Sequence, residues 1–263
     1  MIKIDPSDMK EWKKRKSSRF FIADEIYHRN AELFLKSFPN IKSDIVHAFS
    51  QELHKIEHKV SKSPKKKTGK IEYFKRVTAR SINSSLKDSL KSIHSIKFEV
   101  EYREGVLFDS PQTGGFDFAV FDEEKNIVNF RNYCFGRKPV HNGHIEWENE
   151  LNKRADWNEI ADRLNLPNTK MIGTDIAHLK ASPTVIGEIQ LGNWSLAYYD
   201  MFKVLHLDNL ADLDLLIYVT PTGNLNHYLS DGIVNYSLMQ NILNKYSSIL
   251  KVPIWLIGID VEE

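Results

Sequence analysis

The sequence predicts an α/β fold in which a central mixed β-sheet is flanked by helices, with a helical N-terminal part. Two observations support this prediction. From about residue 172 onward, segments typical of strands and helices follow in the order strand, strand, helix, strand, helix, strand. That order implies a mixed sheet with a helix on each face. Before residue 95, apolar residues recur mainly at the spacing of an amphipathic helix.

The first half of the chain is expected to begin with helices. Apolar residues follow helical spacing from Phe20 to Phe34 and again from Ile45 to Val60. Between the second stripe and a third helical stretch, residues 77–90, lies a segment with Pro64 and Gly69. These two residues break regular elements, so residues 62–70 are predicted to be a loop.

Strand patterns begin near residue 96. Residues 96–102 alternate apolar and polar side chains, as a half-buried strand does. Residues 116–121 and 126–130 flank an acidic turn and are expected to pair as a hairpin. A helix is expected over residues 145–164, ending before Pro167.

The remaining elements lie in the last third of the chain. Strands are expected at residues 172–176, 184–191, 213–219 and 253–259, and helices at residues 194–207 and 232–250.

Composition limits the class of protein. The chain has 263 residues, of which 41% are hydrophobic and 27% charged, as in an ordinary globular protein. No apolar run approaches the roughly 18 residues that a membrane span needs, and the polar N-terminus predicts no signal peptide. Cys134 is the only cysteine, so no intrachain disulfide forms. These features predict a cytoplasmic protein without a membrane partner.

The net charge of +1 hides an asymmetry along the chain. Residues 1–100 hold 23 Lys and Arg against 12 Asp and Glu, whereas the remainder holds 13 against 23. A basic part beside an acidic part suits a protein that binds phosphates with one and metal ions with the other. Lys65, Lys66 and Lys67 are expected to contact a DNA backbone. The alternative is a solvated loop.

Three polar residues near the start of the last third predict a magnesium site. Glu188 and Gln190 share one face of a predicted strand, and Asp175 lies thirteen residues before Glu188. Mg²⁺ takes few protein carboxylates and completes its octahedron with water and phosphate oxygens. Most single acids are surface carboxylates. Glu188, however, lies in an apolar strand, and a buried carboxylate needs a partner.

The motifs around these residues resemble the PD-(D/E)xK nucleases in their E-x-Q form, and in particular the type II restriction endonucleases of the BamHI and BglII kind. The resemblance covers residues 156–263, whereas residues 1–155 resemble no known family and are expected to be integral to one domain. It is carried by Ile172-Gly-Thr-Asp-Ile176, Gly187-Glu-Ile-Gln190, Gly192-Asn-Trp-Ser195, Tyr228-Leu-Ser-Asp-Gly-Ile-Val-Asn-Tyr236 and the strand-like segment 252–259.

The resemblance implies roles for the acidic residues. Asp175 and Glu188 would bind Mg²⁺. Gln190 replaces the usual lysine and, being neutral, would hold a water or the scissile phosphate by hydrogen bonds. Glu159 would supply a further catalytic acid from an upstream helix. Asp162 and Asn158 are competitors for that place, and the alternative for Glu159 is a pair with Lys153 or Arg163 on a helix surface.

The resemblance also implies residues that read DNA. Asn193 and Ser195 would contact bases, since the Asn amide matches the adenine edge. Asn193 also suits a helix N-cap. Asp231 and Tyr199 stand at positions that contact DNA in the resembling enzymes. Gly232 and Tyr199 replace guanine-reading arginines, so the target is not expected to be GGATCC.

The implied activity is that of a type II restriction endonuclease. A homodimer would hydrolyse a palindromic double-stranded DNA site with Mg²⁺ and leave 5′-phosphates, in a bacterial cytoplasm and with a DNA methyltransferase in the same system. The alternatives are a non-cutting sequence-specific DNA-binding protein and a repair or recombination nuclease.

Two other patterns in the sequence resemble catalytic or metal sites. Asp117 with Glu123 to Lys125 spells an acid followed by E-x-K, but the second motif falls in an expected turn. His141 and His144 lack the signature of a histidine-metal nuclease and are expected to lie in a plain loop.

Overall fold

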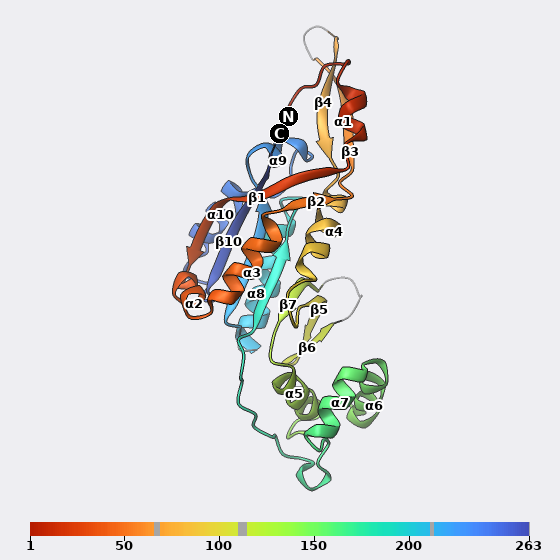
Figure 1. The fold of residues 1–263 in the computed structure, drawn as a ribbon. Coiled ribbons are helices and arrows are strands. Elements are labelled where there is room, and N and C mark those ends of the chain that lie inside the picture. The colour runs from red at the N-terminus through yellow and green to blue at the C-terminus, as the bar shows by residue number, and fades with distance from the viewer. Residues whose placement is uncertain (66–68, 110–114, 211–212, 263) are drawn as a thin grey trace. The chain divides into compact units, whose positions relative to one another are not determined.

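The chain divides into two compact units, each of which is built from separate stretches of sequence. Unit 1 comprises Met1–Ile96, Gly187–Leu205 and Leu215–Glu263, and unit 2 comprises Lys97–Ile186 and His206–Asp214. The computed structural model describes residues 1–65, 69–109, 115–210 and 213–262. Figure 1 shows the course of the chain.

A mixed β-sheet forms the centre of unit 1, as the sequence predicts. β1 runs antiparallel to both β2 and β10, whereas β10 runs parallel to β9. Every residue of β8 and β9 is buried, and such continuous apolar runs are typical of strands covered on both faces. The strand order is β2 (Glu52–His54), β1 (Ser17–His28), β10 (Ile254–Val261), β9 (Leu215–Pro221) and β8 (Val185–Ile189).

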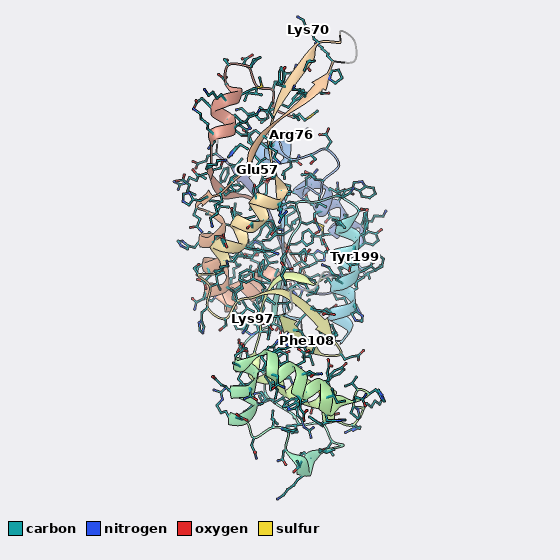
Figure 2. All side chains as sticks on the ribbon, turned by 90° about the vertical axis from the view of Figure 1, so that its right-hand side faces the viewer. Glu57, Lys70, Arg76, Lys97, Phe108 and Tyr199 are labelled. Atoms are coloured by element: carbon teal, nitrogen blue, oxygen red, sulfur yellow. The ribbon has the colours of Figure 1, made fainter. Side chains whose placement is uncertain are left out.

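Helices cover both faces of this sheet. α2 (Ala31–Ser37) and α3 (Pro39–Phe49) lie on one side, and the first part of α8 (Leu196–Leu210) lies on the other, in the views of both Figure 1 and Figure 2. α10 (Tyr236–Lys245) packs against β1, β9 and β10. Unit 1 also contains the helices α4 (Ala79–Leu90) and α9 (Gly223–Tyr228).

A hairpin of β3 (His58–Pro64) and β4 (Ile71–Val77) forms a second, two-stranded sheet in unit 1. Helix α1 (Met9–Lys14) packs on it through Trp12, whose Nε1 donates to the Lys59 carbonyl at 2.8 Å. Figure 2 labels Lys70 near the free end of this hairpin and Arg76 closer to its base. The prediction of a loop over residues 62–70 is therefore wrong at residues 62–64, which lie on β3, whereas β4 begins only at Ile71.

Unit 2 joins antiparallel strands to a small helical cluster. β5 (Lys97–Arg103) pairs with β6 (Val106–Asp109) and with β7 (Phe116–Val120). The Phe130 ring stacks on Trp147 at 5.1 Å and contacts Trp157 at 5.2 Å, so aromatic rings form the centre of the core. The helices are α5 (Glu123–Phe135), α6 (Gly143–Lys153), α7 (Ala155–Arg163) and the 3₁₀ turn Thr169–Met171.

The first two predicted helices are wrong in part. Residues 17–28 form β1, because aromatic and β-branched residues there pair with the buried strand β10, and this pairing outweighs a stripe of helical spacing. The second stripe is helical only as far as Phe49. Its remaining apolar residues, Leu53, Ile56 and Val60, lie on β2, β3 and the connection between them.

Three later predictions also need correction. Residues 126–130 lie within α5 rather than in a hairpin strand, since the Asp122 side chain caps the helix by accepting from the Lys125 backbone N–H at 3.0 Å. The helix expected over residues 145–164 is two helices, α6 and α7. The helix expected over 232–250 is only α10. The strands at 96–102, 184–191, 213–219 and 253–259 and the helix at 194–207 are confirmed in kind.

None of the helices among the described residues is long and apolar enough to cross a membrane.

Candidate active site

Glu188 is a buried carboxylate on β8. It is 8% exposed, and its neighbours Ile186 and Ile189 are buried as well. Its Oε2 lies 3.3 Å from the Lys203 Nζ, which reaches it from α8. The partner that a buried carboxylate requires is therefore at least in part a lysine of the next helix.

The same lysine contacts a second acid. Lys203 Nζ lies 3.2 Å from Asp200 Oδ1, one turn earlier on α8, and Asp200 is 2% exposed. Asp200 Oδ2 also accepts hydrogen bonds from Gln190 Nε2 at 2.7 Å and from the Tyr218 hydroxyl at 2.8 Å. β8, α8 and β9 thus each contribute to one buried polar network, which we call the Glu188 cluster: Glu188, Gln190, Asp200, Lys203 and Tyr218.

The two carboxylates hold Lys203 in its charged form. Burial by itself would lower the pKa of its ammonium group, but the charges of Glu188 and Asp200 outweigh burial and raise the pKa above its ordinary value. The Glu188 cluster consequently contains a charged ammonium group between two carboxyl groups.

The Gln190 side chain is hydrogen-bonded to other groups of the protein. Besides its bond to Asp200, its Oε1 accepts from the Gly192 backbone N–H at 3.0 Å, just after the strand ends. An amide has two N–H donors and two lone pairs, so these two bonds leave capacity for a further partner.

Asp175 lies in unit 2, and the strand predicted over residues 172–176 is absent. Residues 172–174 form a turn and a bend, and the segment is hydrogen-bonded to side chains of helix α5 instead of a strand. The Asn132 side chain donates to the Ile176 carbonyl and accepts from the Ile176 N–H, both at 2.8 Å. Arg131, fully buried, donates to the carbonyls of Met171 and Thr174. Side chains of α5 therefore take the backbone groups that a strand would have offered to a sheet.

The exposed Asp175 carboxylate is fixed at the end of α5. Its Oδ1 accepts from the Arg137 backbone N–H at 2.9 Å. A Cβ at Gly136 would lie 2.3 Å from this same oxygen, so the close approach requires glycine there. Asp175 also lines an open cavity of about 810 Å³ together with Asn132, Arg137 and Lys138. The carboxylate thus faces an open recess whose lining contains a second acid, Glu104, besides the two basic residues.

The donors suit a hard cation. Glu188 and Asp175 both offer carboxylate oxygens, and Glu188 already stabilises a positive charge at its buried position. No group of three or more His, Cys, Asp or Glu side chains that could hold a metal is present among the described residues. Glu188 belongs to unit 1 and Asp175 to unit 2, so their convergence stays a prediction.

Glu159 lies on α7 of unit 2 and is exposed, as are its competitors Asn158 and Asp162. The two basic residues that were its alternative partners on the helix surface pair with other acids. Lys153 pairs with Glu150 at 2.8 Å, and Arg163 pairs with Glu124 at 2.7 Å.

The residues expected to read bases come together in unit 1. Asn193 and Ile233 form an antiparallel bridge, and the Trp194 N–H donates to the Gly232 carbonyl at 3.0 Å. This pairing places Asp231 beside the turn that precedes α8. Asn193 Oδ1 accepts from both the N–H and the hydroxyl of Ser195 at 3.0 Å, which is an Asx turn just before α8 begins at Leu196.

These residues are open to solvent. Asn193, Ser195 and Asp231 are exposed, and Tyr199, one turn into α8 and labelled in Figure 2, is 52% exposed. Lys65, at the end of the β3–β4 hairpin, is exposed too. Lys66 and Lys67 lie outside the described residues.

The two other patterns that resemble sites do not belong to the Glu188 cluster. Glu123 to Lys125 form the first turn of α5, and Glu123 pairs with Lys97 at 3.0 Å. His141 and His144 are exposed at the start of α6.

Sequence reasoning missed Asp200, Lys203 and Tyr218. The spacing of Asp200 and Lys203, three apart on a predicted and largely apolar helix, was a usable signal. Arg131 and Asn132 gave no such signal, because their segment was expected to be a strand.

Comparison with known proteins gives the family. The family described as restriction endonuclease BglII/BglIII matches residues 23–259. A crystal structure of restriction endonuclease BglII complexed with a DNA 16-mer is similar with a TM-score of 0.45 and 15% identity, over 89% of this chain and 74% of that one. Free BglII is similar with a TM-score of 0.41 and 14% identity, over 89% and 77%. No curated protein matches the chain.

The family match covers nearly the whole chain, including most of the first 155 residues, and defines the protein as a type II site-specific deoxyribonuclease. The chain belongs to the BglII/BglIII restriction endonuclease family.

Proposed function

We propose that this restriction endonuclease hydrolyses phosphodiester bonds with Mg²⁺ at a short palindromic site in double-stranded DNA and leaves 5′-phosphates. The observation that carries the proposal is the Glu188 cluster. A buried carboxylate paired with a lysine, two residues before a buried glutamine, stands in a chain of a restriction endonuclease family. The E-x-Q variant of the PD-(D/E)xK site is the arrangement that these residues fit.

Asp175 and Glu188 would hold the metal ion. When bound, Mg²⁺ supplies a water of lowered pKa and a positive charge beside the scissile phosphate. Both carboxylates are restrained, Glu188 by Lys203 and Asp175 by the Arg137 N–H. Restraint of this kind keeps ligand oxygens in place and lowers the cost of binding. The proposal requires that the two units bring these side chains together.

Gln190 and Glu159 would assist without binding the metal. Gln190 remains neutral at pH 7 and is held by Asp200 and Gly192, so its amide would present a hydrogen bond to a water or to the scissile phosphate. Glu159 would approach from α7 as the additional acid.

The turn before α8 would read bases. Asn193, Ser195 and Asp231 lie together there, Tyr199 follows one turn later, and all four are exposed. Exposed amide, hydroxyl and carboxylate groups are the side chains that discriminate base edges in the major groove. Lys65, with Lys66 and Lys67, would contact phosphates.

A homodimer would suit a palindromic target, because two-fold protein symmetry matches two-fold sequence symmetry. Bacterial cytoplasm is the proposed location, with a DNA methyltransferase of the same specificity protecting host DNA.

Digestion of a sequenced plasmid tests the proposal. Magnesium should produce discrete fragments with 5′-phosphate ends, and EDTA should abolish them. A smear would indicate a repair or recombination nuclease. A gel shift without cleavage under any divalent ion would indicate a DNA-binding protein and contradict the proposal.

A further inference from the structure

The Lys203 ammonium group lies between two buried carboxylates. It is 3.3 Å from Glu188 Oε2 and 3.2 Å from Asp200 Oδ1, and its side chain is 13% exposed. Surface lysines that pair with a single acid contribute little and move freely. A lysine bracketed by two acids inside the protein is instead a fixed charge.

Asp200 is itself held in place. It accepts from Gln190 on β8 and from Tyr218 on β9, at 2.7 and 2.8 Å. Lys203 therefore contacts one acid that the two strands immobilise and another, Glu188, that is the proposed metal ligand. Any change of charge at Lys203 therefore changes the electrostatic potential at the Glu188 carboxylate directly.

Resting on the proposed function, we propose that Lys203 is a positioning residue whose fixed positive charge opposes metal binding to the DNA-free protein and balances phosphate charge when DNA is bound. The usual lysine of the motif is replaced by neutral Gln190, so the site has no cation on β8 at that position. Lys203 restores one positive charge from α8.

The sign of the effect follows from electrostatics. A divalent ion at Glu188 is repelled by an ammonium group a few ångströms away, and in a buried place this repulsion is weakly screened. A DNA phosphate adds a negative charge that the ammonium group attracts. Lys203 thus makes metal occupancy depend on bound DNA.

The chain offers a matched control. Lys97 of unit 2, labelled in Figure 2, also bridges two acids, with Nζ 3.0 Å from Glu123 and 2.9 Å from Asp156. Its side chain is 20% exposed. Replacing it removes the same kind of ion pair at a place that is not the proposed metal site.

The experiment compares full-length wild type with Lys203→Gln, Lys203→Met, Lys203→Arg and Lys97→Gln. Manganese affinity is measured by titration calorimetry without DNA, thermal melting checks the fold, and single-turnover cleavage is measured with Mg²⁺. Lys203→Gln should bind Mn²⁺ about tenfold more tightly or better, since its charge is gone while its amide still donates hydrogen bonds. Its cleavage should fall about 100-fold.

The other variants fix the interpretation. Lys203→Arg keeps the charge and should retain wild-type Mn²⁺ affinity. Lys97→Gln should have a lower melting temperature and the same Mn²⁺ affinity as wild type. Lys203→Met repeats the test with a neutral side chain of different packing, so one folded neutral variant suffices. A merely structural lysine would give weaker or unchanged Mn²⁺ binding in the neutral variants, which would overturn the inference.

The metal site and the role of Lys203 are refuted by different results. If wild-type Mn²⁺ binding is unaffected by Glu188→Gln, the proposed metal site itself is wrong. If Glu188→Gln abolishes binding but Lys203→Gln does not strengthen it, only the role of Lys203 is wrong.

Discussion

The two carboxylates assigned to the metal are held in opposite ways. Glu188 is buried in a strand, and its carboxylate contacts the Lys203 side chain of α8. Asp175 is exposed in a segment outside any helix or strand, and its carboxylate accepts from a backbone N–H just after the end of α5. The core of unit 1 fixes the position of Glu188. The position of Asp175 is fixed by hydrogen bonds from α5 to its chain segment, which we call the clamp.

The difference shows what fixes the position of each carboxylate. A strand in a packed sheet fixes its side chains as a consequence of the fold. The Asp175 segment has no such support, so Arg131 and Asn132 replace a neighbouring strand with hydrogen bonds from a helix. Mutations should therefore affect stability and activity together around Glu188, and activity alone at Asp175.

The largest effect is expected from Glu188→Ala. Removing a metal ligand loses several kcal/mol of charge stabilisation, so cleavage should fall at least about 1,000-fold while DNA binding persists. The variant should also lose about 1–3 kcal/mol of stability, because Lys203 loses one of its two acids. Cleavage kinetics, gel shifts and urea unfolding measure these quantities. Normal cleavage by this variant would refute the site assignment.

Asp175→Asn should separate the two properties. Cleavage should fall by a similar factor, because the carboxylate charge is lost. Stability should change by no more than about 0.5 kcal/mol, since the residue is exposed and an amide oxygen can still accept from Arg137. The same two assays apply. A large loss of stability with intact cleavage would reverse the comparison.

A smaller effect is expected from the clamp. Asn132→Ala removes both bonds to Ile176, and cleavage should fall about tenfold, as is typical when support behind a metal ligand is lost. Asn129→Ala is the matched control. Asn129 lies one turn earlier on α5 and lines the same cavity, but it donates to the Gly105 carbonyl at 2.9 Å rather than to the segment of Asp175. Equal losses in both variants would show that α5 matters only for folding.

The smallest effect is expected at the hairpin, which lies apart in sequence from both acids. Lys65→Gln should weaken DNA binding equally for all sequences and reduce the slope of log affinity against log salt by about 0.9, the contribution of one phosphate contact. Fluorescence anisotropy over a range of salt concentrations measures the slope. An unchanged slope would mean that Lys65 does not contact DNA.

The parts of the structure that sequence predicted best are those whose patterns reflect burial. The apolar runs at β8, β9 and β10 identified these strands, and the position of Glu188 within one of them identified a carboxylate in need of a partner. The expected likeness to BglII-type restriction endonucleases is confirmed by the family match.

Sequence failed where long-range pairing decides the outcome. β1 carries a helical stripe, yet it forms a strand because β10 is there to pair with it. The segment around Asp175 looked like a strand, but its hydrogen-bond partners are the side chains of Arg131 and Asn132, more than forty positions earlier. No local pattern contains such information.

The most direct test asks whether one metal ion touches both acids. Fe²⁺ replaces Mg²⁺ in the DNA-bound enzyme, and ascorbate with oxygen then generates hydroxyl radicals that cut the polypeptide beside the metal. We expect cuts near both Asp175 and Glu188, and the loss of both in Glu188→Ala. Cuts near only one of these residues, or cuts near Asp175 that survive in Glu188→Ala, would contradict a shared metal site.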